Sequence, residues 1–213
     1  MGLEHHPRIV TNGLFLYYDA ANYRSYSGSG VTVNNLFAGF GCTLVNGPLY
    51  SSNNAGYISF DGVNDYGQLT LPALTSWSFS FWIYNHTVPA GATEKQLLST
   101  NTDPTGLSMF NSRYNIWNGN TNLSNASVGQ SVWTNVVFTN ASGSGSAIYL
   151  DGVLDNSFLT SNQIYSGDAQ LLAILSTQRN HQANLGSFMG YNRSISAAEV
   201  FQNYLATKKR YGK

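Results

Sequence analysis

Charge is scarce in this chain. Charged residues make up 9% of the 213 residues, against roughly 25% in an average globular domain. Ten basic and ten acidic residues cancel to a formal net charge of zero. A nucleic-acid-binding protein needs a clustered basic field to meet the phosphates, and the one basic cluster here is Lys208–Arg210. The composition therefore argues against nucleic acid as a partner.

Cysteine and long apolar runs are also nearly absent. Cys42 is the single cysteine, so no disulfide can form within the chain, and its apolar surroundings predict a small buried side chain. No run of about 18 apolar residues occurs, which argues against a membrane-spanning helix. The first residues also lack the features of a secretory signal peptide. We expect no membrane partner.

Glutamate occurs only three times, as Glu4, Glu94 and Glu199. Hydrolysis of a glycosidic bond usually needs two carboxylates that face each other, roughly 5–10 Å apart. No strand-like segment alternates acidic residues so as to place such a pair on one face. A Gly-x-Ser-x-Gly elbow is missing as well, and Cys42 has no histidine nearby in the sequence. We therefore expect a protein that is not an enzyme.

What the chain does contain is a period-two alternation of side chains over most of its length. In Ser78–Tyr84, one face carries Phe79, Phe81 and Ile83, while the other includes Trp82. This pattern indicates a strand whose two faces are both at least partly covered. Asp151-Gly152 lies between apolar residues and predicts a two-residue type I′ hairpin turn. Many short strands with turn signals between them predict an all-β antiparallel sandwich.

One short helix is expected at the C-terminus. Ser196 is a candidate N-cap, and Glu199 three residues later completes a capping box. Ile195 and Val200 occupy the positions of a hydrophobic staple. An apolar stripe should dock this helix on the sandwich; it consists of Val200, Phe201, Tyr204 and Leu205. Lys208–Arg210 then complement the helix dipole at its end.

The first eleven residues show no periodicity, and the domain is expected to span residues 12–213. Two interpretations of residues 1–11 stay open. They form a disordered end, or they form an arm that becomes ordered only against a neighbouring subunit.

The turn within Phe60–Tyr66 also has two interpretations. Asp, Asn and Gly tolerate the backbone conformations of tight turns, so the segment suits a hairpin. The carboxylates of Asp61 and Asp65, together with Asp19, are also hard oxygen ligands of the kind that Ca²⁺ prefers. We therefore expect that the protein requires no cofactor, and that calcium is a candidate ligand of these three aspartates.

Aromatic residues, 14% of the chain, are the best candidates for ligand binding. Tyr114 and Trp117 flank a turn-rich segment that contains Asn118 and Asn120, and aromatic faces beside Asn side chains are typical of sugar-binding surfaces. Other aromatic residues fall on the non-core side of their strands: Trp82, Tyr84 and Tyr149. The alternative is that such side chains pack under a covering element and bind nothing.

Several motifs, taken in order, resemble those of laminin-G-like domains in the concanavalin A-like family. They are Leu16–Asn22, Gly47-Pro48, Phe60–Tyr66, Tyr149–Gly152, Tyr191–Val200, Gln202–Tyr204 and Lys209–Gly212. The resemblance covers nearly the whole chain. The chain is similar in particular to the single domains that tailed bacteriophages carry as virion structural proteins, especially phages of marine and cyanobacterial hosts.

The resemblance implies a jelly-roll sandwich of two antiparallel sheets. Some members of this family bind Ca²⁺ and glycans at the rim of the sandwich, and Asp19, Asp61 and Asp65 are the matching positions. The glucanase branch carries a Glu-x-Asp-x-x-Glu strand, which this sequence lacks, so the resemblance does not imply a hydrolase.

The hypothesis that follows is a non-enzymatic virion surface protein, such as a capsid decoration or accessory protein. Residues 1–11 would attach it to capsid or other virion proteins, and it would be oligomeric on the particle. The alternative is a carbohydrate-binding adhesin that attaches to a host surface polysaccharide.

Overall fold

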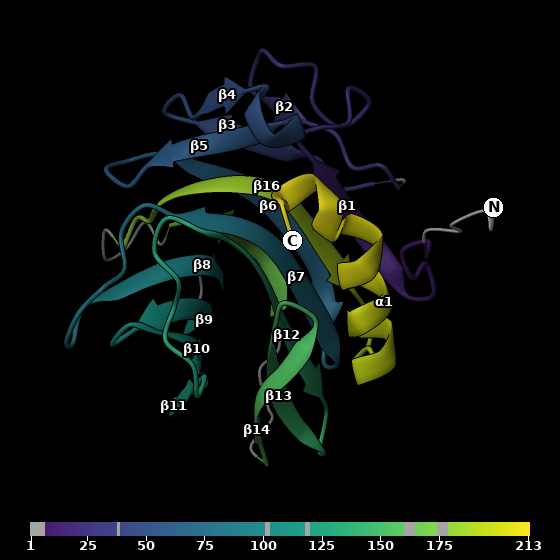
Figure 1. Cartoon of the computed structure of the whole chain (residues 1–213), viewed down its shortest axis with the longest axis vertical. Coiled ribbons are helices and arrows are strands. Elements are labelled where there is room, and N and C mark those ends of the chain that lie inside the picture. The colour runs from purple at the N-terminus through teal and green to yellow at the C-terminus, as the bar shows by residue number, and fades with distance from the viewer. Residues whose placement is uncertain (1–6, 38, 101–102, 118–119, 160–164, 174–178) are drawn as a thin grey trace.

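The protein is a sandwich of two eight-stranded antiparallel sheets (Figure 1). The computed structural model describes residues 7–37, 39–100, 103–117, 120–159, 165–173 and 179–213. The predicted all-β jelly roll with one short C-terminal α-helix is confirmed.

Sheet A contains the N- and C-terminal strands and the longest strands of the middle of the chain. Its order is β14 (Val153–Phe158), β13 (Gly145–Leu150), β12 (Trp133–Ala141), β7 (Trp77–Asn85), β16 (Gln182–Tyr191), β5 (Tyr57–Asp61) and β4 (Leu49–Ser51), and β1 (Leu14–Asp19) also pairs with β16.

Sheet B lies against the inner face of sheet A. Its order is β11 (Thr121–Leu123), β10 (Arg113–Trp117), β9 (Asp103–Phe110), β8 (Glu94–Thr100), β15 (Tyr165–Leu171), β6 (Tyr66–Leu74), β3 (Cys42–Val45) and β2 (Thr32–Val33). A short 3₁₀ helix, η1 (Asn53–Ala55), precedes β5.

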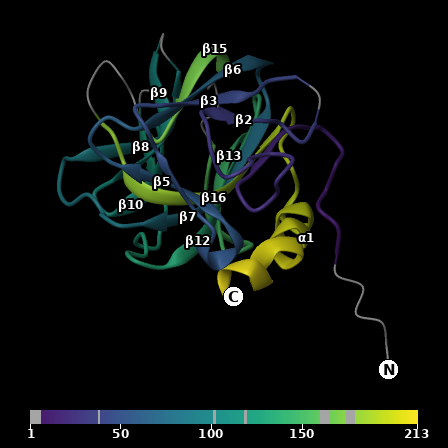
Figure 2. The same cartoon turned by 90° about the horizontal axis from the view of Figure 1, so that it is seen from above.

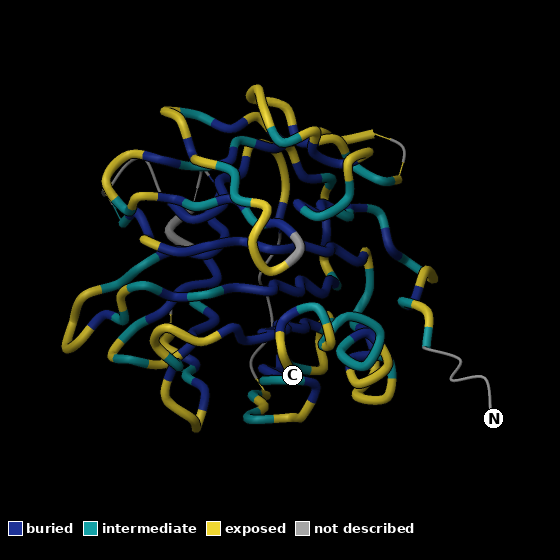
Figure 3. The backbone as a smooth tube through the Cα atoms, turned by 45° about the horizontal axis from the view of Figure 1, so that its top comes forward, coloured by how far each residue is buried: buried dark blue, intermediate teal, exposed yellow. Residues whose placement is uncertain are grey.

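The main core fills the space between the sheets, and the buried chain runs through the middle of the molecule (Figure 3). Aromatic rings form its centre: Phe81 lies 4.7 Å from Phe188 between ring centroids, and Phe79 stacks on Phe188 at 5.7 Å. Cys42 is buried in this core, as predicted.

The outer face of β7 is buried as well, as the sequence predicted for Ser78–Tyr84. It is covered by the C-terminal elements α1 (Ala197–Thr207) and η2 (Lys208–Tyr211), which lie across sheet A (Figure 2). The ring of Trp82 stacks on Tyr211 at 4.1 Å between centroids, and its Nε1–H donates to Thr207 Oγ1 at 2.8 Å.

The Asp151-Gly152 turn has the predicted type I′ conformation. Both residues have positive φ, 47° and 83°, and they join β13 to β14. The Asp151 carboxylate accepts from the backbone N–H of Asn135 at 2.9 Å and from Lys213 Nζ at 2.7 Å. The turn is thereby tied to a neighbouring strand and to the end of the chain.

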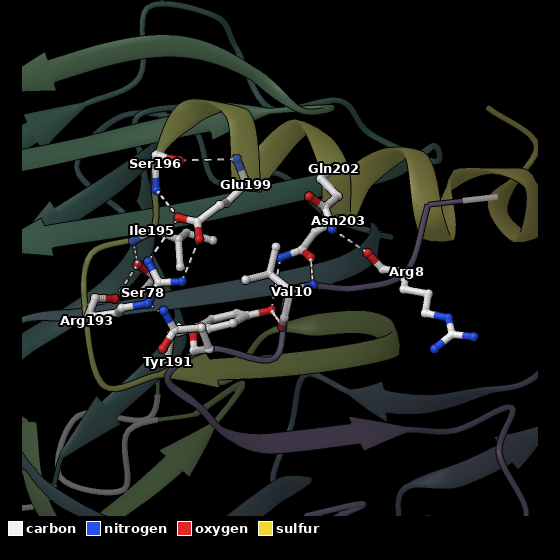
Figure 4. Close-up of polar contacts among 11 residues, drawn as sticks. Arg8, Val10, Ser78, Tyr191, Arg193, Ile195, Ser196, Glu199, Gln202 and Asn203 are labelled. Carbon is white, nitrogen blue, oxygen red and sulfur yellow. Dashed lines mark hydrogen bonds and ion pairs between the residues drawn. The ribbon is translucent and has the colours of Figure 1, made fainter. Parts of the chain in front are cut away.

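The helix begins as predicted. Ser196 Oγ accepts from the Glu199 backbone N–H, and the Glu199 carboxylate accepts from the Ser196 backbone N–H, so both halves of the capping box are present (Figure 4). Ile195 and Val200 are both buried. The docking stripe is partly wrong, because Phe201 is 46% exposed while Asn203 is 2% exposed. The helix packs through Val200 and a buried amide.

That amide holds the N-terminal segment. Asn203 Oδ1 accepts from the Val10 backbone N–H at 2.8 Å, and Tyr191 OH donates to the Val10 carbonyl at 3.0 Å (Figure 4). The Arg8 carbonyl accepts from Gln202 Nε2 at 2.7 Å. Residues 8–10 of the expected arm are therefore ordered against their own chain, not only against a neighbour. Residues 1–6 lie outside the described residues.

Lys208–Arg210 lie in η2 at the end of the C-terminal helix, as predicted, and the chain leaves it at Gly212 with φ 74°. None of the helices in the described part of the chain is both long and apolar enough to cross a membrane.

Candidate ligand-binding site

A pocket of about 380 Å³ opens on the outer face of sheet B, where β8, β9, β10 and β11 lie side by side. It is lined by side chains from these strands and from the two connecting segments: Ala92, Glu94, Phe110, Asn115, Trp117, Thr121 and Arg179. This volume lies within the range of small-ligand sites in proteins.

Strand register brings these residues together. In a strand, alternate side chains point to the same face, so Asn115 and Trp117 share the outer face of β10. Trp117 is paired with Thr121 on β11 and with Gly106 on β9. Glu94 is paired with Phe110. The aromatic rings of Trp117 and Phe110 therefore come from different strands to one surface.

One ion pair forms the charged part of the pocket. Arg179 donates from its guanidinium to Glu94 Oε2, and the two side chains are 37% and 11% exposed. The other lining residues that the structure describes carry no charge. The pocket therefore presents a charge-neutralised pair beside uncharged amide, hydroxyl and aromatic groups.

Hydrogen bonds between side chains and backbone fasten the outermost strands. Asn115 Nδ2 donates to Ser108 Oγ at 3.2 Å, and Asn115 Oδ1 accepts from the Asn122 backbone N–H at 2.9 Å. Asn122 Nδ2 donates in turn to the Ile116 carbonyl at 2.9 Å. These buried contacts hold β9, β10 and β11 in the positions that form the pocket.

The predicted ligand-binding residues do not all reach this pocket. Trp117 lines it, half-buried, and Asn120 is exposed beside β11, directly before Thr121. Asn118 lies outside the described residues. The prediction for Tyr114 is wrong, because residues three apart in a strand point to opposite faces. Tyr114 lies on the inner face of β10 and is fully buried in the core.

Tyr114 belongs instead to a buried polar network. Its hydroxyl accepts from Asn85 Nδ2 at 3.1 Å, and Asn85 Oδ1 accepts from His181 Nε2 at 2.8 Å. Burial lowers the pKa of His181 to about 3, and it raises the pKa of Tyr114. The network is uncharged and closed to solvent, so it serves the core.

The other aromatic side chains on the non-core side pack under a covering element. Trp82 lies beneath Tyr211, and Tyr149 is buried in the cluster that docks the helix. Tyr84 is half-buried and packs edge-on against Trp133. For Trp82, Tyr84 and Tyr149, the structure thus shows the alternative that the sequence left open, in which the side chains pack within the protein.

Asp19 is committed to an ion pair. Its two carboxylate oxygens accept from the guanidinium of Arg210, at 2.8 and 2.9 Å, and Tyr17 OH donates to Oδ2 at 3.0 Å. This contact joins the end of β1 to η2. Arg210 lies 191 residues further along the chain, so no local pattern in the sequence could have identified it.

Asp61 and Asp65 shape the turn between β5 and β6. Asp61 Oδ1 accepts from the backbone N–H groups of Val63, Asn64 and Asp65, at 2.8 to 3.3 Å. Desolvation alone would raise the pKa of Asp61, but these hydrogen bonds outweigh it and lower the pKa. Burial raises the pKa of Asp65, whose Oδ2 accepts from the Asp61 N–H at 3.1 Å.

The three aspartates do not fit one calcium site. Asp19 is opposite Ser187 on β16 and Asp61 is opposite Gln182, a separation of about 16 Å along the strand. No group of three or more potential metal ligands of the His, Cys, Asp or Glu type occurs among the described residues. One carboxylate oxygen of Asp61 and one of Asp65 accept hydrogen bonds from the turn backbone, which explains the place of these residues in the turn without a metal.

Several residues of the pocket were not found from the sequence. Glu94, Phe110, Asn115 and Arg179 carry no motif, and they come from four separate segments. The only signal available was Trp117 at the edge of a turn-rich segment.

Comparison with known proteins identifies the scaffold. A family model described as the concanavalin A-like lectin/glucanases superfamily matches residues 53–201. No curated protein matches the sequence.

Solved structures share the fold. A Trypanosoma rangeli sialidase in complex with the inhibitor DANA has a TM-score of 0.68 and 15% identity, covering 97% of this chain and 36% of that one. The binding domain of Botulinum neurotoxin serotype G has a TM-score of 0.67 and 16% identity, covering 90% and 50%. The binding domain of Paraclostridial Mosquitocidal Protein 1 has a TM-score of 0.71 and 13% identity, covering 90% and 52%.

This chain thus spans about a third to a half of the length of these solved structures. At these identities the likeness shows the fold alone.

Calcium should therefore leave the domain unchanged. We expect the midpoint of thermal unfolding to be the same in millimolar CaCl₂ and in EDTA, because Asp19 is paired with Arg210 and lies too far from Asp61 to share one ion. A rise of several degrees with calcium that disappears in Asp61→Asn would contradict this assignment and place a metal in the turn.

Proposed function

Since the chain belongs to the concanavalin A-like lectin/glucanases superfamily, we propose that it is a non-enzymatic carbohydrate-binding module displayed on the surface of a bacteriophage virion. The observation that carries the binding role is the pocket on the outer face of sheet B, with Trp117, Asn115 and the Glu94–Arg179 pair in its lining.

The chemistry of this pocket suits a sugar. One face of a pyranose ring presents C–H groups, which pack on the negative face of an aromatic ring such as Trp117 or Phe110. The rim of the same sugar presents hydroxyls, which pair with amide, hydroxyl and charged groups. A few placed polar groups beside apolar surface are typical of sites that bind and orient a small ligand.

The same pocket argues against hydrolysis. Its lining includes one carboxylate, Glu94, and this group is paired with Arg179. Cleavage of a glycosidic bond by the usual routes needs two carboxylates on opposite sides of the bond. The proposal is therefore binding without turnover.

The proteins of similar fold are consistent with carbohydrate binding, but the proposal does not rest on them. Two of the similar solved structures are described as binding domains, and a third belongs to a sialidase. Fold alone does not fix function. We favour the carbohydrate-binding alternative over a purely structural decoration protein, because decoration requires no such recess.

The virion setting rests on the resemblance of the sequence motifs to phage structural domains and on the low charge of the chain, which suits packing against neighbours. Residues 1–11 remain the candidate attachment to capsid or other virion proteins. Their described part, residues 7–11, lies on the sheet A side with α1, and the pocket opens on the opposite sheet. Attachment there would leave the pocket free, including in an oligomer.

Trp117 offers a direct test of the binding role. We expect the wild-type protein to bind members of a glycan array and Trp117→Ala to lose at least about tenfold in affinity, because the stacking surface is removed. Phe201→Ala is the matched control, since Phe201 is an exposed aromatic residue on α1. Equal binding by wild type and Trp117→Ala would contradict this site, and binding to no glycan would contradict the function.

The virion setting is tested separately. We expect mass spectrometry of purified phage particles to detect this protein at a copy number matching a surface component. We further expect deletion of residues 1–11 to remove it from the particles. Absence of the wild-type protein from the particles would refute the virion setting, and retention of the truncated protein would refute attachment through this segment.

A further inference from the structure

Gln96 is fully buried, yet neither polar atom of its amide has a hydrogen-bond partner among the described residues. Glu94 Oε1, two residues earlier on the same face of β8, is buried and unpartnered in the same way. A buried polar group without a partner lowers stability, because it loses its hydrogen bonds to water. Three such atoms on neighbouring residues call for a physical explanation.

These atoms lie beside the pocket. Gln96 is paired with Ser108, which is paired with Asn115, so the three side chains form a row across the outer face of sheet B. The Gln96 backbone N–H donates to the Arg179 carbonyl at 3.1 Å. Asn115, Arg179 and Glu94 all line the pocket. Gln96 therefore neighbours pocket residues, although it is not itself part of the lining.

Gly106 gives the amide its position. A Cβ atom built at this glycine would lie 2.6 Å from Gln96 Oε1, closer than such atoms approach in proteins. Gly106 is also directly opposite Trp117. The missing side chain leaves room for the Gln96 amide next to the strand position that carries the tryptophan.

We propose that Gln96 is a specificity-determining residue of this pocket, whose amide, together with Glu94 Oε1, binds vicinal hydroxyls of an uncharged sugar ring stacked on Trp117. This inference rests on the proposed carbohydrate function. An amide offers a donor and an acceptor side by side, and adjacent hydroxyls on a pyranose ring present the complementary acceptor and donor.

The charge distribution selects against acidic sugars. The positive charge of Arg179 is neutralised by Glu94, and the second oxygen of that carboxylate is the one left unpartnered. A sugar carboxylate or sulfate brought to this oxygen would be repelled, whereas a hydroxyl would donate to it. The ligand is therefore a neutral sugar.

The Arg179 side chain controls how a ligand reaches Glu94 Oε1 and the Gln96 amide. For a hydroxyl to reach Glu94 Oε1 and Gln96, the Arg179 side chain shifts toward the solvent that already contacts 37% of its surface, while its guanidinium stays paired with Glu94 Oε2. The unpartnered atoms then gain partners from the ligand. The stability that the free protein gives up at Gln96 is recovered as binding free energy, which is the usual relation between stability and function at a binding site.

The competing explanation is that an ordered water satisfies Gln96 and the residue serves the fold alone. Gln96→Leu separates the two, because an apolar side chain of similar size removes the unpaired amide. We expect this variant to unfold at a higher temperature than the wild type and to bind at least about tenfold more weakly. Gln170→Leu is the control, since Gln170 is equally buried on sheet B but its amide atoms are not among the unpartnered ones of the described residues. That change should lower the unfolding temperature and leave binding unchanged.

The probes are the methyl glycosides of glucose, mannose and galactose, and methyl glucuronide as the acidic counterpart, with binding followed by ligand-observed NMR. We expect at least one neutral glycoside to bind in competition with an array ligand, with dependence on Trp117 and Gln96.

Tighter binding of the glucuronide overturns the neutral-sugar assignment. Trp117-dependent binding that Gln96→Leu leaves intact, or a Gln96→Leu variant that is destabilised, overturns the role of Gln96 and leaves the proposed function standing. Failure of every probe and array glycan to bind overturns both.

Discussion

The stacking of Tyr211 on Trp82 fastens the C-terminal elements over the outer face of sheet A. β7 carries large side chains on both faces, and apolar surface of that size is costly to leave in water. The inner face meets sheet B, whereas the outer face needs the C-terminal helix. Two further contacts hold α1 and η2 in place over sheet A. Arg210 pairs with Asp19, and Asn203 accepts a hydrogen bond from Val10. Both ends of the chain are thus used to complete one sheet.

This constraint bears on where we propose that a ligand binds. With α1 and η2 over the outer face of β7, we place the proposed ligand in the recess on the outer face of sheet B. There the side chains of β8, β9 and β10 are polar but buried, and the row of Gln96, Ser108 and Asn115 replaces what would be apolar packing in a purely structural sheet. Of this row only the Gln96 side-chain amide lacks a hydrogen-bond partner among the described residues, and the proposed ligand would supply one.

Features encoded by neighbouring residues could be predicted, and features that depend on pairing between distant segments could not. The capping box of Ser196 and the turn at Asp151 are local, so the sequence was sufficient for both. Trp117 was found because it adjoins a turn. Glu94, Gln96 and Arg179 join it through strand register, which one sequence does not reveal. The prediction that Tyr114 binds a ligand was wrong for a simpler reason. Tyr114 is three residues from Trp117 and therefore faces the core. The resemblance supplied the jelly roll but not the ligand face.

We propose that sheet B presents the sugar site. A crystal structure of the domain with a bound neutral oligosaccharide tests this proposal. We expect a pyranose ring on the face of Trp117, with hydroxyls within hydrogen-bond distance of Gln96 and Glu94 and with the Arg179 side chain shifted outward. A sugar bound instead at the Asp61–Asp65 turn, or on the sheet A side beside α1, would contradict it.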